Sequence, residues 1–123
     1  MQIEQTRNTP FINIDFENRV FEIKGPSYSE NIVEIYTPLI EYIESNIVHL
    51  DGSLECELYF DVLNSISHKK IFQILISLNN FYQEGKDIKV KWYYDADDED
   101  ILEMGEDLME LIDIPFEIYS VES

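Results

Sequence analysis

This chain of 123 residues is poor in the residue types on which several common activities depend. Its single cysteine, Cys56, cannot form an internal disulfide, and with two histidines no Cys/His ligand set suits a zinc ion. Four glycines are too few for a glycine-rich phosphate-binding loop, and no Gly-x-Ser-x-Gly segment is present. We therefore expect no metal site and no cofactor. We also expect a buried thiol at Cys56, which lies in an apolar segment.

Basic residues are scarce as well. Eight Lys and Arg face 26 Asp and Glu, which gives a formal net charge of -18 at pH 7. Such a charge repels the phosphates of nucleic acids and the anionic surface of membranes. It favours a protein partner with a basic or neutral contact face.

Long apolar segments are also missing. No apolar run reaches the roughly 20 residues that span a bilayer, and Met1 to Thr9 is too polar for a signal peptide. We expect a cytoplasmic protein without membrane insertion. Hydrophobic residues make up 45% of the chain, including eight Tyr and seven Phe, which predicts one aromatic-rich core. The length predicts a single domain over residues 1–123, with its core at about 9–121.

The first half of the chain begins with an alternation of apolar and polar residues. This alternation predicts a hairpin of strands Phe11–Phe16 and Arg19–Lys24, which Gly25-Pro26 ends. An apolar face at helical spacing follows, with Asn31 as its predicted N-cap. Pro38 removes a backbone hydrogen bond, so we expect either a kink there or a helix start near Thr37.

The second half alternates strands with helices. The predicted elements are strand Leu54–Leu63, helix Ser67–Glu84, strand Ile88–Tyr94, a helix over about 101–112, and strand Phe116–Val121. The order β-β-α-β-α-β-α-β predicts an α/β domain with a mixed sheet of about five strands and three helices.

The acidic run Asp95 to Asp100 could bind a hard cation, but its spacing fits no calcium loop. Asp97 as an N-cap, with acids in the first turn, complements the helix dipole. We interpret the run as a cap and a solvated face, and keep a weak ion or partner contact as the alternative. Core packing explains the aromatic residues Trp92, Tyr93 and Tyr94 at the end of the preceding strand.

The segment from Asn64 to Lys69 joins a strand to a helix and carries two hydroxyls, on Ser65 and Ser67. Asn64 or either serine can cap the helix, and a serine can also accept a phosphate. A helix N-terminus tolerates the phosphate charge, so modification would change binding without unfolding the domain. Ser65 and His68 are also close enough on one turn to suggest a small hydrolase, although no third, orienting group is apparent.

Several short motifs occur in one order along nearly the whole chain. They are Thr9-Pro10, Ile23-Lys24-Gly25-x-Ser27-Tyr28-x-Glu30-Asn31, Tyr36-x-Pro38, Asn64-Ser65-x-Ser67-x-Lys69, Trp92-Tyr93-Tyr94-Asp95-x-Asp97-Asp98-Glu99-Asp100, Gly105-Glu106-Asp107 and Pro115-Phe116. Together they resemble the SiaC family of bacterial regulatory phosphoproteins. That family is similar in fold to STAS domains, the fold of anti-sigma-factor antagonists, which agrees with the predicted element order.

The resemblance implies a partner switch that is not itself an enzyme. It implies phosphorylation of Ser65, with Ser67 as the second choice, by a dedicated kinase, and dephosphorylation by a PP2C-type phosphatase. In the best-known branch the unphosphorylated protein activates a diguanylate cyclase, which links it to cyclic di-GMP and biofilm control. The partner-binding residues implied are Tyr28, Glu30, Asn31, Asn64, Ser67 and Lys69.

The chain departs from the family pattern at Ser65, where Thr is familiar, at Ile66, where Ser is familiar, and at Ser29, where Pro is familiar. Ser65 keeps the hydroxyl that a kinase needs. The alternative to a phosphorylated switch is a constitutive acidic adaptor that binds its partners through the acidic face and the aromatic residues.

Overall fold

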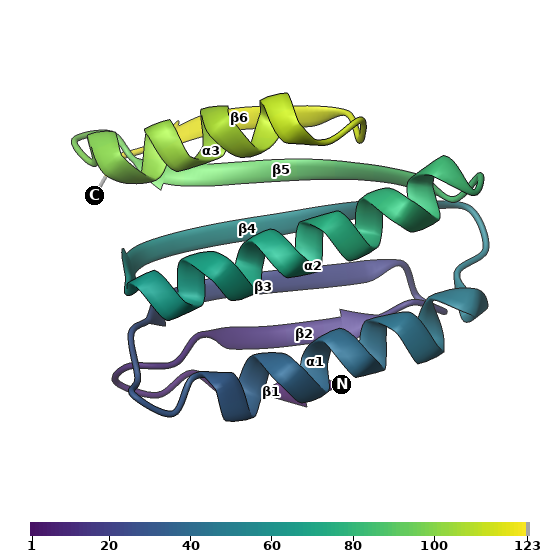
Figure 1. Ribbon diagram of the computed structural model, residues 1–123, viewed down its shortest axis with the longest axis horizontal. Helices are drawn as coiled ribbons and strands as arrows, with labels where there is room; N and C mark the ends of the chain where they lie inside the picture. The colour runs from purple at the N-terminus through teal and green to yellow at the C-terminus, as the bar shows by residue number, and fades with distance from the viewer. Residues whose placement is uncertain (123) are drawn as a thin grey trace.

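The computed structural model describes residues 1–122 and forms a six-stranded sheet with three α-helices (Figure 1). Along the sheet, the strands follow one another in sequence order. The elements are β1 (Gln2–Ile3), β2 (Phe11–Asp15), β3 (Val20–Ser27), α1 (Val33–Asn46), a 3-10 turn η1 (Ile47–His49), β4 (Ser53–Leu63), α2 (Ser65–Gln83), β5 (Asp87–Asp95), α3 (Glu99–Leu111) and β6 (Phe116–Val121).

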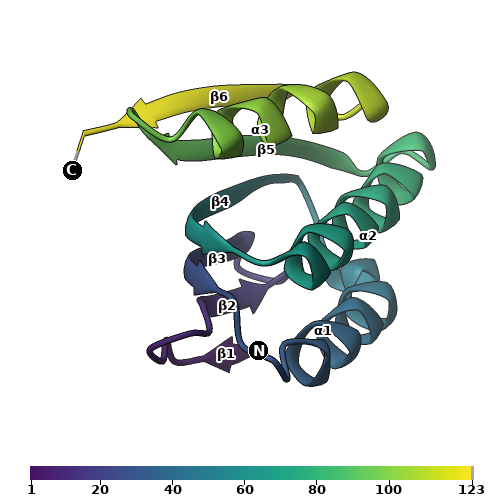
Figure 2. The same cartoon turned by 60° about the vertical axis from the view of Figure 1, so that its left-hand side comes forward.

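The connections between strands explain the layered arrangement. The strands β1, β2 and β3 pair antiparallel, whereas β3, β4, β5 and β6 pair parallel. Each parallel step moves one position along the sheet in the same direction through one helix. Because such crossovers are right-handed, all three helices lie on the same face, as Figures 1 and 2 show. The predicted α/β class, mixed sheet and three helices are confirmed, with β1 as a strand that was not predicted.

The second hairpin strand is longer than predicted. It continues through Gly25 and Pro26 to Ser27, and its register against β4 shifts between Gly25 and Ser27. The pairing with β2 ends at Lys24, so no neighbour on that side needs the N–H that Pro26 lacks. Gly25 has a φ of 121°, a conformation that glycine adopts without strain. The expectation that Gly25-Pro26 ends the strand is therefore wrong.

The start of α1 separates the two alternatives predicted for this helix. The helix begins at Val33 and Pro38 lies inside it, so the alternative start near Thr37 is wrong. Ile32 occupies the N-cap position and no side chain caps the helix, so the prediction of Asn31 as the cap is wrong. Instead, the Asn31 N–H donates to the Ser29 hydroxyl at 3.2 Å, in the turn that precedes the helix.

The core lies between the sheet and its helices. Its largest fully buried side chains include Trp92, Tyr36, Phe21 and Phe60, which confirms the predicted aromatic-rich core. Cys56 is buried as well, and burial raises the pKa of its thiol, which opposes reactivity. None of the helices among residues 1–122 combines the length and apolar character needed to cross a membrane.

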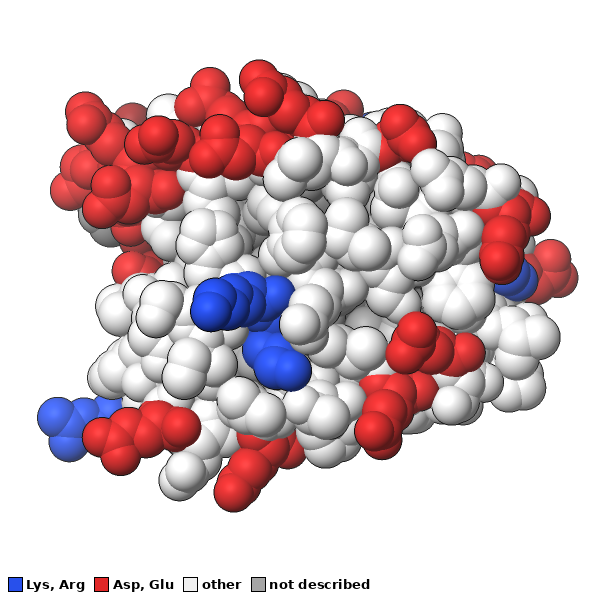
Figure 3. All heavy atoms as spheres, viewed as in Figure 1, with Lys and Arg blue, Asp and Glu red and all other residues white. Residues whose placement is uncertain are grey.

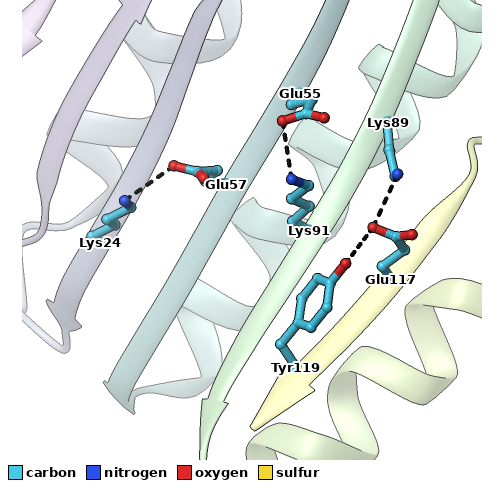
Figure 4. Close-up of polar contacts among 7 residues, drawn as sticks. All are labelled: Lys24, Glu55, Glu57, Lys89, Lys91, Glu117 and Tyr119. Atoms are coloured by element: carbon cyan, nitrogen blue, oxygen red, sulfur yellow. Dashed lines mark hydrogen bonds and ion pairs between the residues drawn. The ribbon is translucent and has the colours of Figure 1, made fainter. Parts of the chain in front are cut away.

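The side chains of the sheet that alternate with the core residues form ion pairs between neighbouring strands (Figure 4). The three pairs are Lys24–Glu57 at 3.1 Å, Lys91–Glu55 at 3.0 Å and Lys89–Glu117 at 3.0 Å. All six side chains are partly exposed, so each pair contributes at most about 1 kcal/mol to stability. This face therefore holds three of the chain's eight basic residues in local pairs.

Candidate functional site

The site begins where the parallel strands β3 and β4 end side by side, with Ser27 opposite Leu63. This register places the loop after β3 against the start of α2. The Asn64 N–H donates to the Ser27 carbonyl at 3.1 Å, and the Asn64 side-chain amide donates to the Ser29 carbonyl at 3.3 Å. Two of the predicted motifs, 40 positions apart at Ser27 and Ser67, therefore meet in one place.

Asn64 is the residue that caps α2. Its backbone is extended, with φ -95° and ψ 171°, and its side-chain oxygen accepts the Ser67 N–H at 2.8 Å. Of the three candidate caps, the structure selects Asn64. The helix consequently starts at Ser65, two positions before the predicted start at Ser67.

Ser65 is the first residue of α2 and is exposed to solvent. Because Asn64 supplies the cap, the Ser65 hydroxyl is not needed to hold the helix start. Among the described residues, its side chain makes no hydrogen bond. A kinase requires an acceptor hydroxyl that it can reach from solvent, and the backbone N–H groups at this helix N-terminus favour the negative charge of a phosphate.

Ser67 faces the interior and is completely buried. Its hydroxyl donates to the Ser27 carbonyl at 2.8 Å and accepts from the Ser27 hydroxyl at 2.8 Å. The Ser27 hydroxyl also shares a hydrogen bond of 2.7 Å with the buried Tyr36 phenol, whose pKa is raised by desolvation. Neither a kinase nor a partner can reach Ser67 in this fold, so its predicted roles as second acceptor and contact residue are wrong.

The remaining predicted contact residues lie at the surface on both sides of Asn64. Tyr28 is 39% exposed, and its hydroxyl donates to the Arg7 carbonyl at 3.2 Å. Glu30 and Asn31 are exposed in the same loop, and Lys69 is exposed one turn into α2. The structure joins Asn64 to this loop through Ser29. Lys69 instead lines a groove that the sequence did not reveal.

That groove runs beside Ser65 between α2 and α3. Its first part has a volume of about 320 Å³, and its lining includes Ser65, His68, Asp100, Glu103 and Asp107. Glu103 and Asp107 were not among the predicted site residues, and Asp100 was considered only within the acidic run. The spacing of three and four positions from Asp100 to Glu103 to Asp107 places them on one helix face and is the signal that could have identified them.

The groove does not assemble hydrolase machinery. A nucleophilic serine requires a hydrogen-bonded base that a third group orients. Within residues 1–122 no hydrogen bond joins Ser65 to His68, and none joins His68 to a carboxylate. The geometry therefore does not support the hydrolase alternative.

The acidic run ends in a helix cap. Asp98 occupies the N-cap position of α3 and accepts the Ile101 N–H at 3.1 Å, so the cap lies one position after the predicted Asp97. Glu99 and Asp100 follow in the first turn, where they complement the helix dipole. Across residues 1–122, no group of three or more His, Cys, Asp or Glu side chains is arranged to hold a metal ion.

In structural terms the protein is an α/β domain with an exposed hydroxyl at the start of a helix. A family model described as SiaC family regulatory phosphoprotein matches residues 3–121. The chain belongs to the SiaC family of regulatory phosphoproteins.

Relatives with known sequence or structure agree with this membership. The chain is 30% identical over 118 residues to an uncharacterised protein of Pseudomonas aeruginosa strain UCBPP-PA14. The aligned region covers 96% of this chain and 94% of that protein. It is similar to SiaC in a crystal structure of the diguanylate cyclase SiaD with its activator SiaC from Pseudomonas aeruginosa, with a TM-score of 0.89, 30% identity and coverage of 98% and 99%. Apo-SiaC from the same organism gives a TM-score of 0.87 at 29% identity, with 98% of each chain covered.

Proposed function

We propose that this protein is a phosphorylation-controlled binding protein that is not itself an enzyme, and that Ser65 is the residue phosphorylated. The observation that carries the proposal is the exposed Ser65 hydroxyl at the first position of α2, beside a cap that Asn64 provides independently. A phosphate there gains the favourable field of the helix N-terminus. The fold therefore keeps its stability in both states, as a reversible switch requires.

The partner proposed for the unphosphorylated form is a diguanylate cyclase. The support is membership of the SiaC family and similarity to a SiaC that was crystallised as the activator of the cyclase SiaD. The net charge of -18 fits a partner whose contact face is basic or neutral. By this route the protein would control cyclic di-GMP, and through it biofilm formation.

A dedicated kinase and a PP2C-type phosphatase complete the proposed switch. They act on one hydroxyl, that of Ser65, which is exposed to solvent. The contact residues proposed for these partners are Asn64, which precedes Ser65 and is bonded to the loop after β3, and the exposed residues Tyr28, Glu30, Asn31 and Lys69. The proposal places all of these proteins in the cytoplasm, where the kinase has access to ATP.

Phosphorylation is expected on Ser65 and not on Ser67, since Ser65 is exposed and Ser67 is completely buried. The measurement is mass spectrometry of phosphopeptides from the protein purified from its native cells with phosphatase inhibitors present. A Ser65→Ala variant, which keeps Ser67, serves as the control and should lose the phosphate. Phosphate found on another residue, with Ser65 unmodified, would contradict the proposal.

A further inference from the structure

The groove beside Ser65 continues along α2 and α3 into a second part with a volume of about 570 Å³. Ser65, His68 and Asp107 line both parts, so the two form one continuous surface. The α3 residues that line it run from Asp100 to Leu111, about three helical turns or ~16 Å at 1.5 Å per residue. This length matches a short helical segment of a partner.

The floor of the second part is apolar and lacks a cover. Phe72 from α2 and Leu111 from α3 both line it and remain 38% and 59% exposed. The buried Leu108, three positions before Leu111 on α3, also lines the groove. Neighbouring exposed apolar side chains of this kind, bordered by polar groups, are typical of surfaces that bind a protein segment.

The two walls of the groove carry opposite charge. On the α3 side, Asp100, Glu103 and Asp107 line it, whereas Lys69 is the one lysine or arginine among the lining residues and lies on α2. Figure 3 shows acidic side chains gathered over the start of α3, basic side chains over the first half of α2, and an uncharged strip between them. A bound segment therefore meets a negative wall on one side and a positive wall on the other.

We infer that this groove binds an amphipathic helix whose apolar stripe is flanked by Lys or Arg on one side and by Asp or Glu on the other. The apolar stripe covers Phe72, Leu108 and Leu111, the basic flank faces α3, and the acidic flank faces Lys69. Opposite charges on the two walls select one direction of the bound helix, because reversing the helix would place like charges together.

This arrangement also gives the direction of the switch, and in that respect it rests on the proposed function of Ser65. A phosphate on Ser65 lies four positions before Lys69 on the same helix, where the two groups can pair. Pairing neutralises the positive wall, and the remaining phosphate charge makes it negative. The acidic flank of the partner helix is then repelled, so phosphorylation weakens binding although the opposite wall is unchanged.

Three synthetic helical peptides with the same leucine stripe test the inference on the full chain. Their flanks carry Lys and Glu, Lys and Lys, or Glu and Glu. By isothermal titration calorimetry, the Lys/Glu peptide should bind unmodified protein about fivefold or more tighter than the Glu/Glu peptide. In Ser65→Glu protein the Lys/Glu peptide should bind more weakly, and the Lys/Lys peptide more tightly, than in wild type.

Variants locate the binding to the groove. Asp107→Lys should weaken the affinity for the Lys/Glu peptide several-fold. Glu106 is exposed on α3 but does not line the groove, so Glu106→Lys should leave that affinity unchanged. Circular dichroism verifies that both variants are folded. Equal affinity for all three peptides, or equal loss in both variants, would overturn the inference. If peptide binding fails in this way but cells carry phosphate on Ser65, the proposed function stands and only the groove inference falls. If the peptides bind as expected but Ser65 is never phosphorylated, the proposed function falls and the groove inference stands.

Discussion

Gly105→Ala should destabilise the protein by about 1–3 kcal/mol, although alanine normally stabilises a helix relative to glycine. Gly105 is buried in α3 against the indole of Trp92. A Cβ at this position would lie 2.5 Å from both Cδ1 and Nε1 of that ring. The ring cannot easily move, because its Nε1–H donates to the Ile101 carbonyl at 3.0 Å and Phe60 and Phe116 pack around it.

Urea unfolding of wild type and Gly105→Ala measures this effect. Glu106→Ala is the matched control, since it changes the adjacent, exposed position of the same helix and should leave stability nearly unchanged. In a Trp92→Leu background, Gly105→Ala should lower the free energy of unfolding by less than it does in wild type, because the indole atoms that clash with the added methyl group are absent. A stabilised Gly105→Ala protein would show that α3 does not pack on Trp92 as described.

Ser27→Ala should lower the free energy of unfolding by about 1–3 kcal/mol, because it removes the hydroxyl that links α1, β3 and α2 beneath the Ser65 turn. The Tyr36 phenol then loses its partner inside the core, and the Ser67 hydroxyl loses the hydrogen bond that it accepts. The carbonyl of residue 27 still accepts from Asn64 and Ser67, so the turn itself should persist.

A double-mutant cycle with Tyr36→Phe, followed by thermal unfolding, measures this contribution. Once Ser27 is alanine, removing the Tyr36 hydroxyl should cost little or even restore stability, since an unpaired buried hydroxyl disappears. Two fully additive losses would indicate that the two hydroxyls do not interact.

Much of the fold could be predicted because apolar periodicity and burial coincide. The central strands and the long helix after Asn64 were located to within two residues, since their buried faces alternate at the spacing of strand or helix. Their order then fixed the sheet, because consecutive parallel strands need right-handed crossovers. The same pattern placed Ser65 in the turn before this helix, two positions before its predicted start at Ser67, whereas Ser65 is the first residue of α2.

The errors have two causes. Ser67 lies four positions before the buried Ile71, so helical spacing already places it on the core face of α2. Because the predicted helix began only at Ser67, its hydroxyl was treated as part of an exposed turn. The other errors arise where tertiary neighbours decide the structure. Gly25-Pro26 normally ends a strand, yet the absence of a partner for Pro26 on one side allows β3 to continue. The acidic wall from α3 could not be placed beside Ser65 until the sheet brought α2 and α3 together.

We propose that the phosphorylation state of Ser65 controls the binding of a partner. The most direct test compares affinity for the diguanylate cyclase of the same organism between unmodified protein and protein stoichiometrically phosphorylated on Ser65. We expect at least about a tenfold weaker complex for the phosphorylated protein, with thermal stability nearly unchanged. Equal affinity of the two forms would contradict the switch and favour a constitutive acidic adaptor.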